Sequence, residues 1–124
     1  MQPRPHLPRL APIDSYGNGG FRFGGMSHRG SLLCLPSGMY AWHVGSADAI
    51  SEESLALVLA EADAIDALFI GTGATASLLP PVLRKRLREG SVNTETMQTG
   101  AAIRIYNILV GEQRRVAAAL IAVG

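Results

Sequence analysis

The C-terminal segment of the chain restricts its possible folds more than any other feature, because a clear helix pattern is followed there by a long apolar run. Thr99 is a residue type favoured at the start of a helix, and Gly111 is a type that often ends one. Between them the apolar side chains form two stripes, and only Arg104 and Asn107 make a polar edge. The pattern predicts a helix over Thr99–Val110 that is buried between two layers.

The apolar run that follows, Val116–Val123, has two interpretations from the residues alone. Alanine is the best helix former, which favours a helix. However, Gly111 has just ended a helix, and both alternating faces of the run are apolar, as in a strand that is buried on both faces. In either case the run is too short to cross a bilayer as a helix.

The rest of the chain divides into a β-rich half and an alternating half. In the first half, short apolar or alternating runs at 21–23, 31–35 and 39–44 lie between glycine and proline turns, which is typical of a strand meander. In the second half, helix patterns alternate with apolar strands, which predicts the α/β class. The expected elements are a helix after the cap residue Ser51, a strand over Asp66–Ile70, a helix from Pro80-Pro81 to Gly90 with the apolar face Leu79, Val82, Leu83 and Leu87, and a strand over Ser91–Met97.

Composition favours a single packed α/β domain over residues 13–124, preceded by a flexible, Pro-rich N-terminus over residues 1–12. Of the 124 residues, 48% are hydrophobic and only 17% are charged, which excludes a disordered chain. The net charge is +1, so no overall field draws the protein to nucleic acid or anionic lipid. The basic cluster at residues 84–88 is best explained as a solvated helix face, because no aromatic residues lie nearby to stack on bases. We expect no nucleic-acid partner and no transmembrane segment.

Cysteine and histidine usage argues against a disulfide, a metal centre or another cofactor. Cys34 is the single cysteine, and it lies in an apolar run where a thiol usually packs as a small hydrophobe. A reducing compartment and the lack of a secretory signal pattern lead us to expect a cytoplasmic protein. The three histidines lack the spacing of metal ligands, and spacing suggests no catalytic set. We therefore expect no cofactor and leave enzymatic activity open.

Two glycine turns form the candidate ligand site. Gly71-Thr72-Gly73 follows one predicted strand, and Thr99-Gly100 follows another and begins a helix, where backbone N–H groups and the helix dipole favour an anion. Since ligands of open α/β sheets collect beyond the C-terminal ends of the strands, we expect the two turns to face one crevice. Arg104 and Asn107 of the predicted helix complete the candidate set.

Each of these residues also has a structural explanation. Gly71-Thr72-Gly73 would then be a plain tight turn, while Thr99 would cap the helix and Gly100 would let it approach the sheet. A buried Arg104 needs an acceptor, and a structural partner such as Glu112 or a backbone carbonyl is favoured over a ligand.

Ordered motifs along most of the chain resemble one known family. They are Tyr16-Gly17-Asn18-Gly19-Gly20-Phe21, Leu35-Pro36 followed by Trp42, Gly71-Thr72-Gly73, Leu79-Pro80-Pro81, Thr99 to Leu109 and Glu112 to Ile121. The family has no known biochemical activity and includes mitochondrial respiratory complex I assembly factor 3 and the adipogenesis-associated protein of the same fold. The resemblance covers roughly residues 13 to 123. Gln98 and Ile105 replace an acid and a threonine that are common in the family, so a function of those polar side chains would be missing here.

The resemblance implies a three-layer α/β fold with a mixed sheet, a β-rich N-terminal half and helices packed on the sheet, and it favours a strand for Val116–Val123. The mitochondrial members take part in assembling respiratory complex I, so the leading hypothesis is a non-enzymatic binding or assembly factor that holds a protein partner. The alternative is a binder of a small anionic molecule, or an enzyme acting on one, with its cleft at the two glycine turns. A flat exposed apolar patch would favour the first, and a closed positive pocket at those turns the second.

Overall fold

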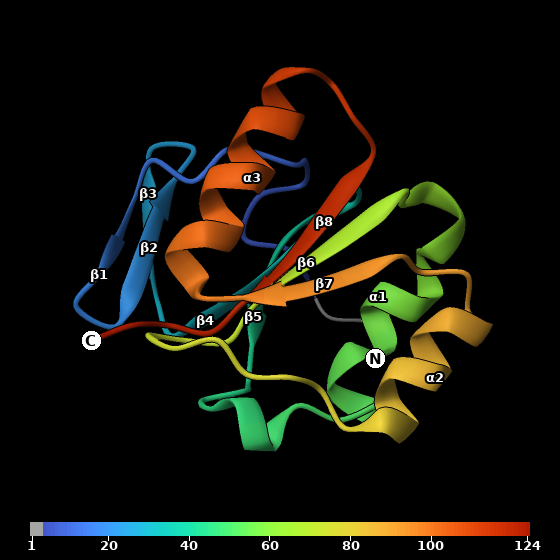
Figure 1. The fold of residues 1–124 in the computed structure, drawn as a ribbon. Helices are drawn as coiled ribbons and strands as arrows, with labels where there is room; N and C mark the ends of the chain where they lie inside the picture. Colours follow the sequence, from blue (N-terminus) through green and yellow to red (C-terminus); the bar gives the residue numbers. More distant parts are fainter. Residues whose placement is uncertain (1–3) are drawn as a thin grey trace.

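A five-stranded mixed sheet forms the middle of the molecule in the computed structural model, which describes residues 4–124 (Figure 1). The strands are β4 (Ser31–Leu35), β5 (Gly38–Trp42), β6 (Ala67–Gly71), β7 (Thr94–Met97) and β8 (Val116–Leu120). Their order across the sheet is β5-β4-β8-β6-β7. Strand β8 is antiparallel to β4 and parallel to β6, and all of its residues are buried. The interior strand predicted at Val116–Val123 is therefore confirmed, and it ends at Leu120.

Helices and a second, smaller sheet cover the two faces of this central sheet, and together they make three layers (Figure 1). One face carries α1 (Ala56–Ala60) and α2 (Pro81–Glu89), with 3-10 turns at Ala47–Ala49, Glu53–Leu55 and Ala62–Ala64. The other face carries α3 (Thr99–Gly111) and the antiparallel sheet of β1 (Ser15–Gly17), β2 (Gly20–Phe23) and β3 (Met26–Arg29). The predicted α/β class with a strand-rich first half is confirmed.

Alternation along β8 builds a separate core on each face of the central sheet. Ala117 and Ala119 pack on the side of α1 and α2, where Leu87 of α2 is fully buried. Ala118 points the other way and packs in the cluster that contains Tyr106 of α3. Small alanine side chains on both faces of the middle strand leave room for these larger residues from the covering layers.

Helix α3 packs on the sheet through one face only, which corrects the expectation that it is buried between two layers. Its buried residues are Thr99, Ala102, Ile103 and Tyr106. On the opposite side Ile108 is 56% exposed, and Arg104, which the sequence pattern placed in the interior, is exposed as well. Apolar periodicity identifies the helix, but it cannot show whether a second apolar stripe meets another part of the same chain.

Helix α2 begins as predicted, with Pro81 in its first turn, but its C-terminal end differs from the prediction. Gly90 has a φ of −81°, and the left-handed residue is Ser91, with a φ of 63°. The Val92 N–H donates to the Leu87 carbonyl at 2.9 Å, as the Schellman motif requires. The sequence interpretation therefore placed the left-handed residue one position too early. It also placed Val82 on the apolar face, whereas Val82 is 81% exposed.

Helix α3 ends in the same motif, again without glycine at the left-handed position. Gly111 is its last helical residue, and Gln113 has a φ of 61°. The Arg114 N–H donates to the Leu109 carbonyl at 2.9 Å. The predicted helix end at Val110 is therefore one residue short, and the left-handed residue comes two positions after Gly111.

The remaining boundaries shift by a few residues. The strands predicted at Asp66–Ile70 and Ser91–Met97 are Ala67–Gly71 and Thr94–Met97. The helix expected after Ser51 is replaced by short 3-10 turns around the five-residue α1. The pattern located the elements, and tertiary packing decided where each one begins.

The Pro-rich N-terminus is described from residue 4 onward, so residues 1–3 of this predicted flexible segment lie outside the described residues. The His6 N–H donates to the Met39 carbonyl at 2.7 Å, and the Met39 N–H donates to the Leu7 carbonyl at 2.9 Å. Ala11 is 1% exposed. These contacts place the segment against β5 and α3, and its mobility stays a prediction. Across residues 4–124, no helix combines the length and the hydropathy that a bilayer crossing demands.

Candidate functional site

The two predicted glycine turns meet in the structure, and they bond to each other. The Thr99 N–H donates to the Gly73 carbonyl at 2.9 Å, and the Gly73 N–H donates to the Thr99 hydroxyl at 3.0 Å. The same hydroxyl donates to the Ile121 carbonyl at 2.7 Å. Thr99 is fully buried and is the first residue of α3, while Gln98 holds the N-cap position. The Thr99 side chain therefore links three segments, and the expectation that it caps the helix is wrong.

Close packing explains Gly71. A Cβ atom on Gly71 would lie 2.7 Å from the Thr99 Cα atom, which is a backbone contact that no side-chain rotation can relieve. The neighbouring Thr72 is 7% exposed, and its N–H donates to the Met97 carbonyl at 2.8 Å. Its hydroxyl donates to the Thr75 carbonyl at 2.8 Å and accepts the Ser77 N–H at 3.0 Å. These contacts stabilise the turn from within the chain.

The other predicted site residues lie together at a different place. Gly100, Arg104 and Asn107 line an open pocket of about 370 Å³. Tyr16 contributes to the same pocket, and a Cβ atom on Gly100 would lie 2.2 Å from its hydroxyl oxygen. Glycine at this position therefore keeps space for Tyr16.

The Asn107 side chain forms hydrogen bonds with the backbone of Ile13. Its amide nitrogen donates to the Ile13 carbonyl and its amide oxygen accepts the Ile13 N–H, both at 2.8 Å. These two bonds have the pattern of a hydrogen-bonded residue pair in an antiparallel sheet, and they attach the segment before β1 to α3. Anion binding by the seven predicted residues stays a prediction, although several of their polar atoms already hold protein partners.

A buried tyrosine of α3, Tyr106, points toward the central sheet. The Tyr106 hydroxyl donates to the Ala11 carbonyl at 2.6 Å. Burial raises the pKa of the nearby Cys34 thiol to about 12, and burial also raises the pKa of Tyr106. Neither group is ionised at neutral pH, so Cys34 is not an activated nucleophile. Among residues 4–124, no three His, Cys, Asp or Glu side chains come together as metal ligands would.

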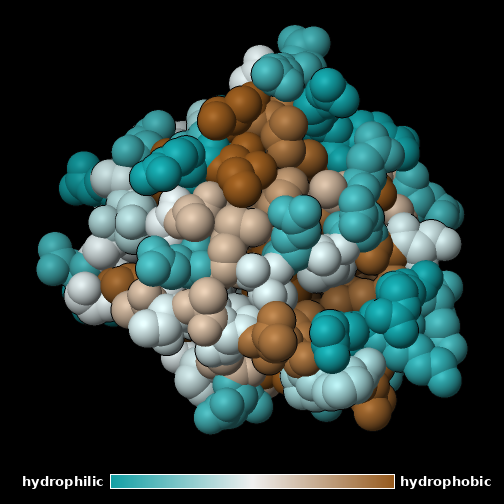
Figure 2. All heavy atoms as spheres, viewed as in Figure 1, coloured by the Kyte–Doolittle hydropathy of each residue, from teal (hydrophilic) through white to brown (hydrophobic). Residues whose placement is uncertain are grey.

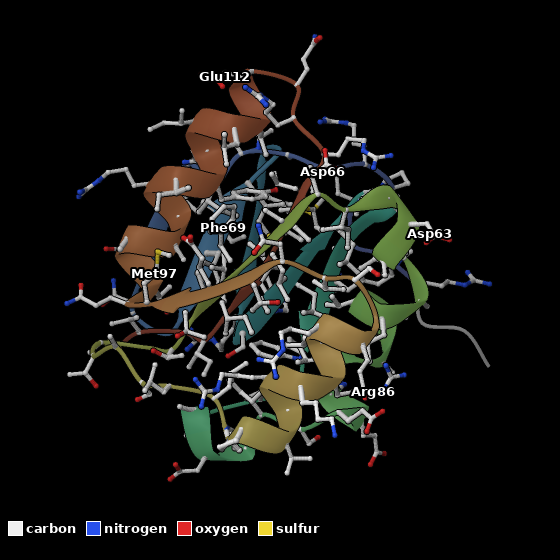
Figure 3. All side chains as sticks on the ribbon, turned by 45° about the vertical axis from the view of Figure 1, so that its right-hand side comes forward. Asp63, Asp66, Phe69, Arg86, Met97 and Glu112 are labelled. Carbon is white, nitrogen blue, oxygen red and sulfur yellow. The ribbon has the colours of Figure 1, made fainter. Side chains whose placement is uncertain are left out.

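The side of α3 that faces away from the sheet is exposed and partly apolar. We call it the α3 outer face. Helical spacing puts these residues on it: Ala101, Arg104, Ile105, Ile108, Gly111 and Glu112. Figure 2 shows a hydrophobic patch over the C-terminal half of the helix, bordered by hydrophilic residues. Glu112 lies at the C-terminal end of α3, while Met97 lies beside its N-terminal end and Phe69 of β6 lies beneath it (Figure 3). Sequence reasoning counted Ile108 as core and so missed this surface, while Ile105 at its edge is half-buried against the core.

Comparison with known proteins identifies a family. The model of the family described as "Protein of unknown function (DUF498/DUF598)" matches residues 13–121. An uncharacterised protein of Rhodobacter capsulatus is 39% identical over 122 residues, which are 98% of this chain and 93% of that protein. A crystal structure of a Bartonella henselae protein, described there as an outer membrane protein, is 50% identical with a TM-score of 0.92, and the match covers 96% of this chain and 100% of the other.

A relative with a named role extends the comparison. NADH dehydrogenase (ubiquinone) 1 alpha subcomplex assembly factor 3 of Xenopus tropicalis is 36% identical over 109 residues. The match covers 88% of this chain but only 60% of the assembly factor, so the chain spans about three fifths of that relative's length. The predicted resemblance to the family that contains this assembly factor is confirmed.

Proposed function

This chain belongs to the DUF498/DUF598 family of proteins of unknown function, and on that premise we propose that it is a binding or assembly factor that holds a protein partner. The relatives named as assembly factors support a role in assembling a larger protein complex, such as a membrane complex. The lone, fully buried Cys34 fits a reducing compartment, and we place the protein in the cytoplasm as part of this proposal.

The observation that carries the proposal is the α3 outer face. Ile108 exposes 56% of its surface on a well-packed helix, next to the partly exposed Ile105. Exposed apolar groups on a rigid element, rimmed by charged residues such as Arg104 and Glu112, are typical of protein interaction sites. Strands β6 and β8 hold the helix through Ala102 and Tyr106, so the face is presented in one fixed orientation. A rigid face of this kind needs no reorganisation before it binds.

Affinity purification from the native organism, followed by mass spectrometry, tests the proposal. The bait is the tagged chain, and the matched baits are Ile108→Glu on the α3 outer face and Val82→Glu on α2. Both residues are highly exposed, so neither substitution should unfold the protein. We expect a protein that the wild-type and Val82→Glu baits capture and the Ile108→Glu bait loses. Equal capture of every protein by all three baits would contradict a docking role for this face.

A further inference from the structure

We propose that the α3 outer face docks against the same face of a second copy of this chain, with the two helices antiparallel. The inference rests on the proposed function, because it names an occupant of the same surface. A two-fold axis through Ile108 would place Ile108 of one copy against Ile108 of the other. In such an interface each residue i that meets residue j is matched by j meeting i.

Charge along the helix is complementary to itself about that axis. Arg104 lies four residues before Ile108 and Glu112 lies four residues after it, so all three share one side of the helix. In the antiparallel pair, Arg104 of each copy meets the oppositely charged Glu112 of the other, which gives two equivalent ion pairs. Within residues 4–124, Arg104 takes part in no salt bridge, and Glu112 has one exposed contact with Arg114 at 3.7 Å. The two charges are therefore available, because an exposed contact at that length is weak.

Shape along the helix is complementary in the same register. Ile105 lies three residues before Ile108 and Gly111 lies three residues after it, so Ile105 of one copy and Gly111 of the other stand at the same level along the pair, on either side of the Ile108 contact. Apart from its chain neighbours and the backbone of its own helix, a Cβ atom on Gly111 would find no atom within 4 Å, so no packing contact in the described structure requires glycine there. Glycine is less favourable than alanine inside a helix. A large side chain of a second helix would fill the space that Gly111 leaves, as ridges fill grooves in helix packing.

The size of the surface sets the strength of the contact. A helix of 13 residues is about 20 Å long. A pair of such helices buries less than the ~1,200 Å² of a stable complex, so association should be weak and concentration-dependent. The second copy covers the apolar face while no other partner holds it, and a partner of the proposed function competes with it.

Sedimentation equilibrium from about 1 to about 500 µM tests the proposal, and a reversible monomer–dimer equilibrium is expected in that range. Arg104→Glu alone and Glu112→Arg alone should each weaken dimerisation about tenfold, because both ion pairs become repulsions. The double variant with both reversals should restore it, since the charges are then exchanged symmetrically. Arg84→Glu, a reversal at an exposed position of α2, is the matched control and should leave dimerisation unchanged.

Gly111→Leu separates docking from folding. Leucine is a good helix former, so thermal stability at low concentration should be maintained or raised, while dimerisation should be lost. A protein that stays monomeric up to about 500 µM overturns the inference, and so does a dimer that Gly111→Leu leaves intact or a double reversal as weak as the single ones. The proposed function would survive each of these outcomes if the Ile108→Glu bait still loses a captured protein of different sequence.

Discussion

The two ends of helix α3 are built in opposite ways. At the N-terminal end, Thr99 is fully buried and its hydroxyl bonds to two other segments, while Gly71 packs directly against its backbone. At the C-terminal end, no atom from outside its own helix turn lies within 4 Å of where a Gly111 side chain would begin, and Gln113 adopts a left-handed φ of 61° that favours glycine. One end is determined by contacts with residues far away in the sequence, and the other follows only local rules.

This contrast predicts substitutions of opposite sign at the two ends. Where distant segments converge on one residue, almost any change leaves a clash or an unpaired polar group, so stability falls. Where only the local conformation matters, the native residues are not the best available, and replacement can raise stability. Four predictions test the contrast, each measured as the free energy of unfolding in denaturant at a low micromolar protein concentration.

Gly71→Ala should have the largest effect, a loss of about 3 kcal/mol or more, because the new Cβ atom meets the backbone of Thr99 and one layer must shift. Gly45→Ala is the matched control, since a Cβ atom there meets nothing within 4 Å, and it should change stability by less than about 0.5 kcal/mol. Equal stability of the two variants would show that α3 and β6 are not tightly joined.

Thr99→Val should lower stability by about 2–3 kcal/mol, because it leaves the Gly73 N–H and the Ile121 carbonyl buried without their partner. Thr99→Ser keeps the hydroxyl and loses one buried methyl group, so it should lose only about 1 kcal/mol. If the serine variant is the less stable of the two, the hydroxyl does not link the segments.

Gly111→Ala should raise stability by up to about 1 kcal/mol, because alanine is the better helix former and its methyl group has free space. Gly100→Ala is the comparison at the other end of the same helix, where a Cβ atom meets the Tyr16 hydroxyl at 2.2 Å. Stabilisation by both changes would remove the difference between the two ends.

Gln113→Gly should have the smallest effect, a gain of about 0.5 kcal/mol, because relief of the left-handed conformation is partly offset by the greater freedom of glycine in the unfolded chain. Gln113→Ala, which keeps the unfavourable conformation, should show no gain. A denaturant series that ranks alanine above glycine here would mean that the helix end adopts a different conformation in solution.

The same contrast explains what the sequence could predict. Helix α3 was found because its apolar spacing follows local rules, and Pro81 marked the start of α2 for the same reason. The two-faced apolar pattern of Val116–Leu120 likewise identified the central strand, together with the family resemblance. Local geometry and periodicity are properties that a single stretch of sequence contains.

The site was less predictable, because it depends on which residues meet in space. The sequence placed the Gly71–Gly73 and Thr99–Gly100 turns near each other, but it could not show that they bond directly. It counted Ile108 as core, since nothing in the pattern states that the outer side of α3 has no covering layer. Arg104 and Glu112, four residues to either side of Ile108, were the available signal of a solvent-facing stripe.

The place of β8 has a consequence for how the chain acquires its structure. This strand follows its neighbours β4 and β6 in the sequence but lies between them in the sheet. During synthesis the two halves of the sheet therefore emerge with open inner edges. The inner edges of β4 and β6 cannot pair with β8 until residues 116–120 leave the ribosome. Closure joins β4 to a strand more than eighty residues away, so folding of this chain should be slow for its size and limited by one late insertion step.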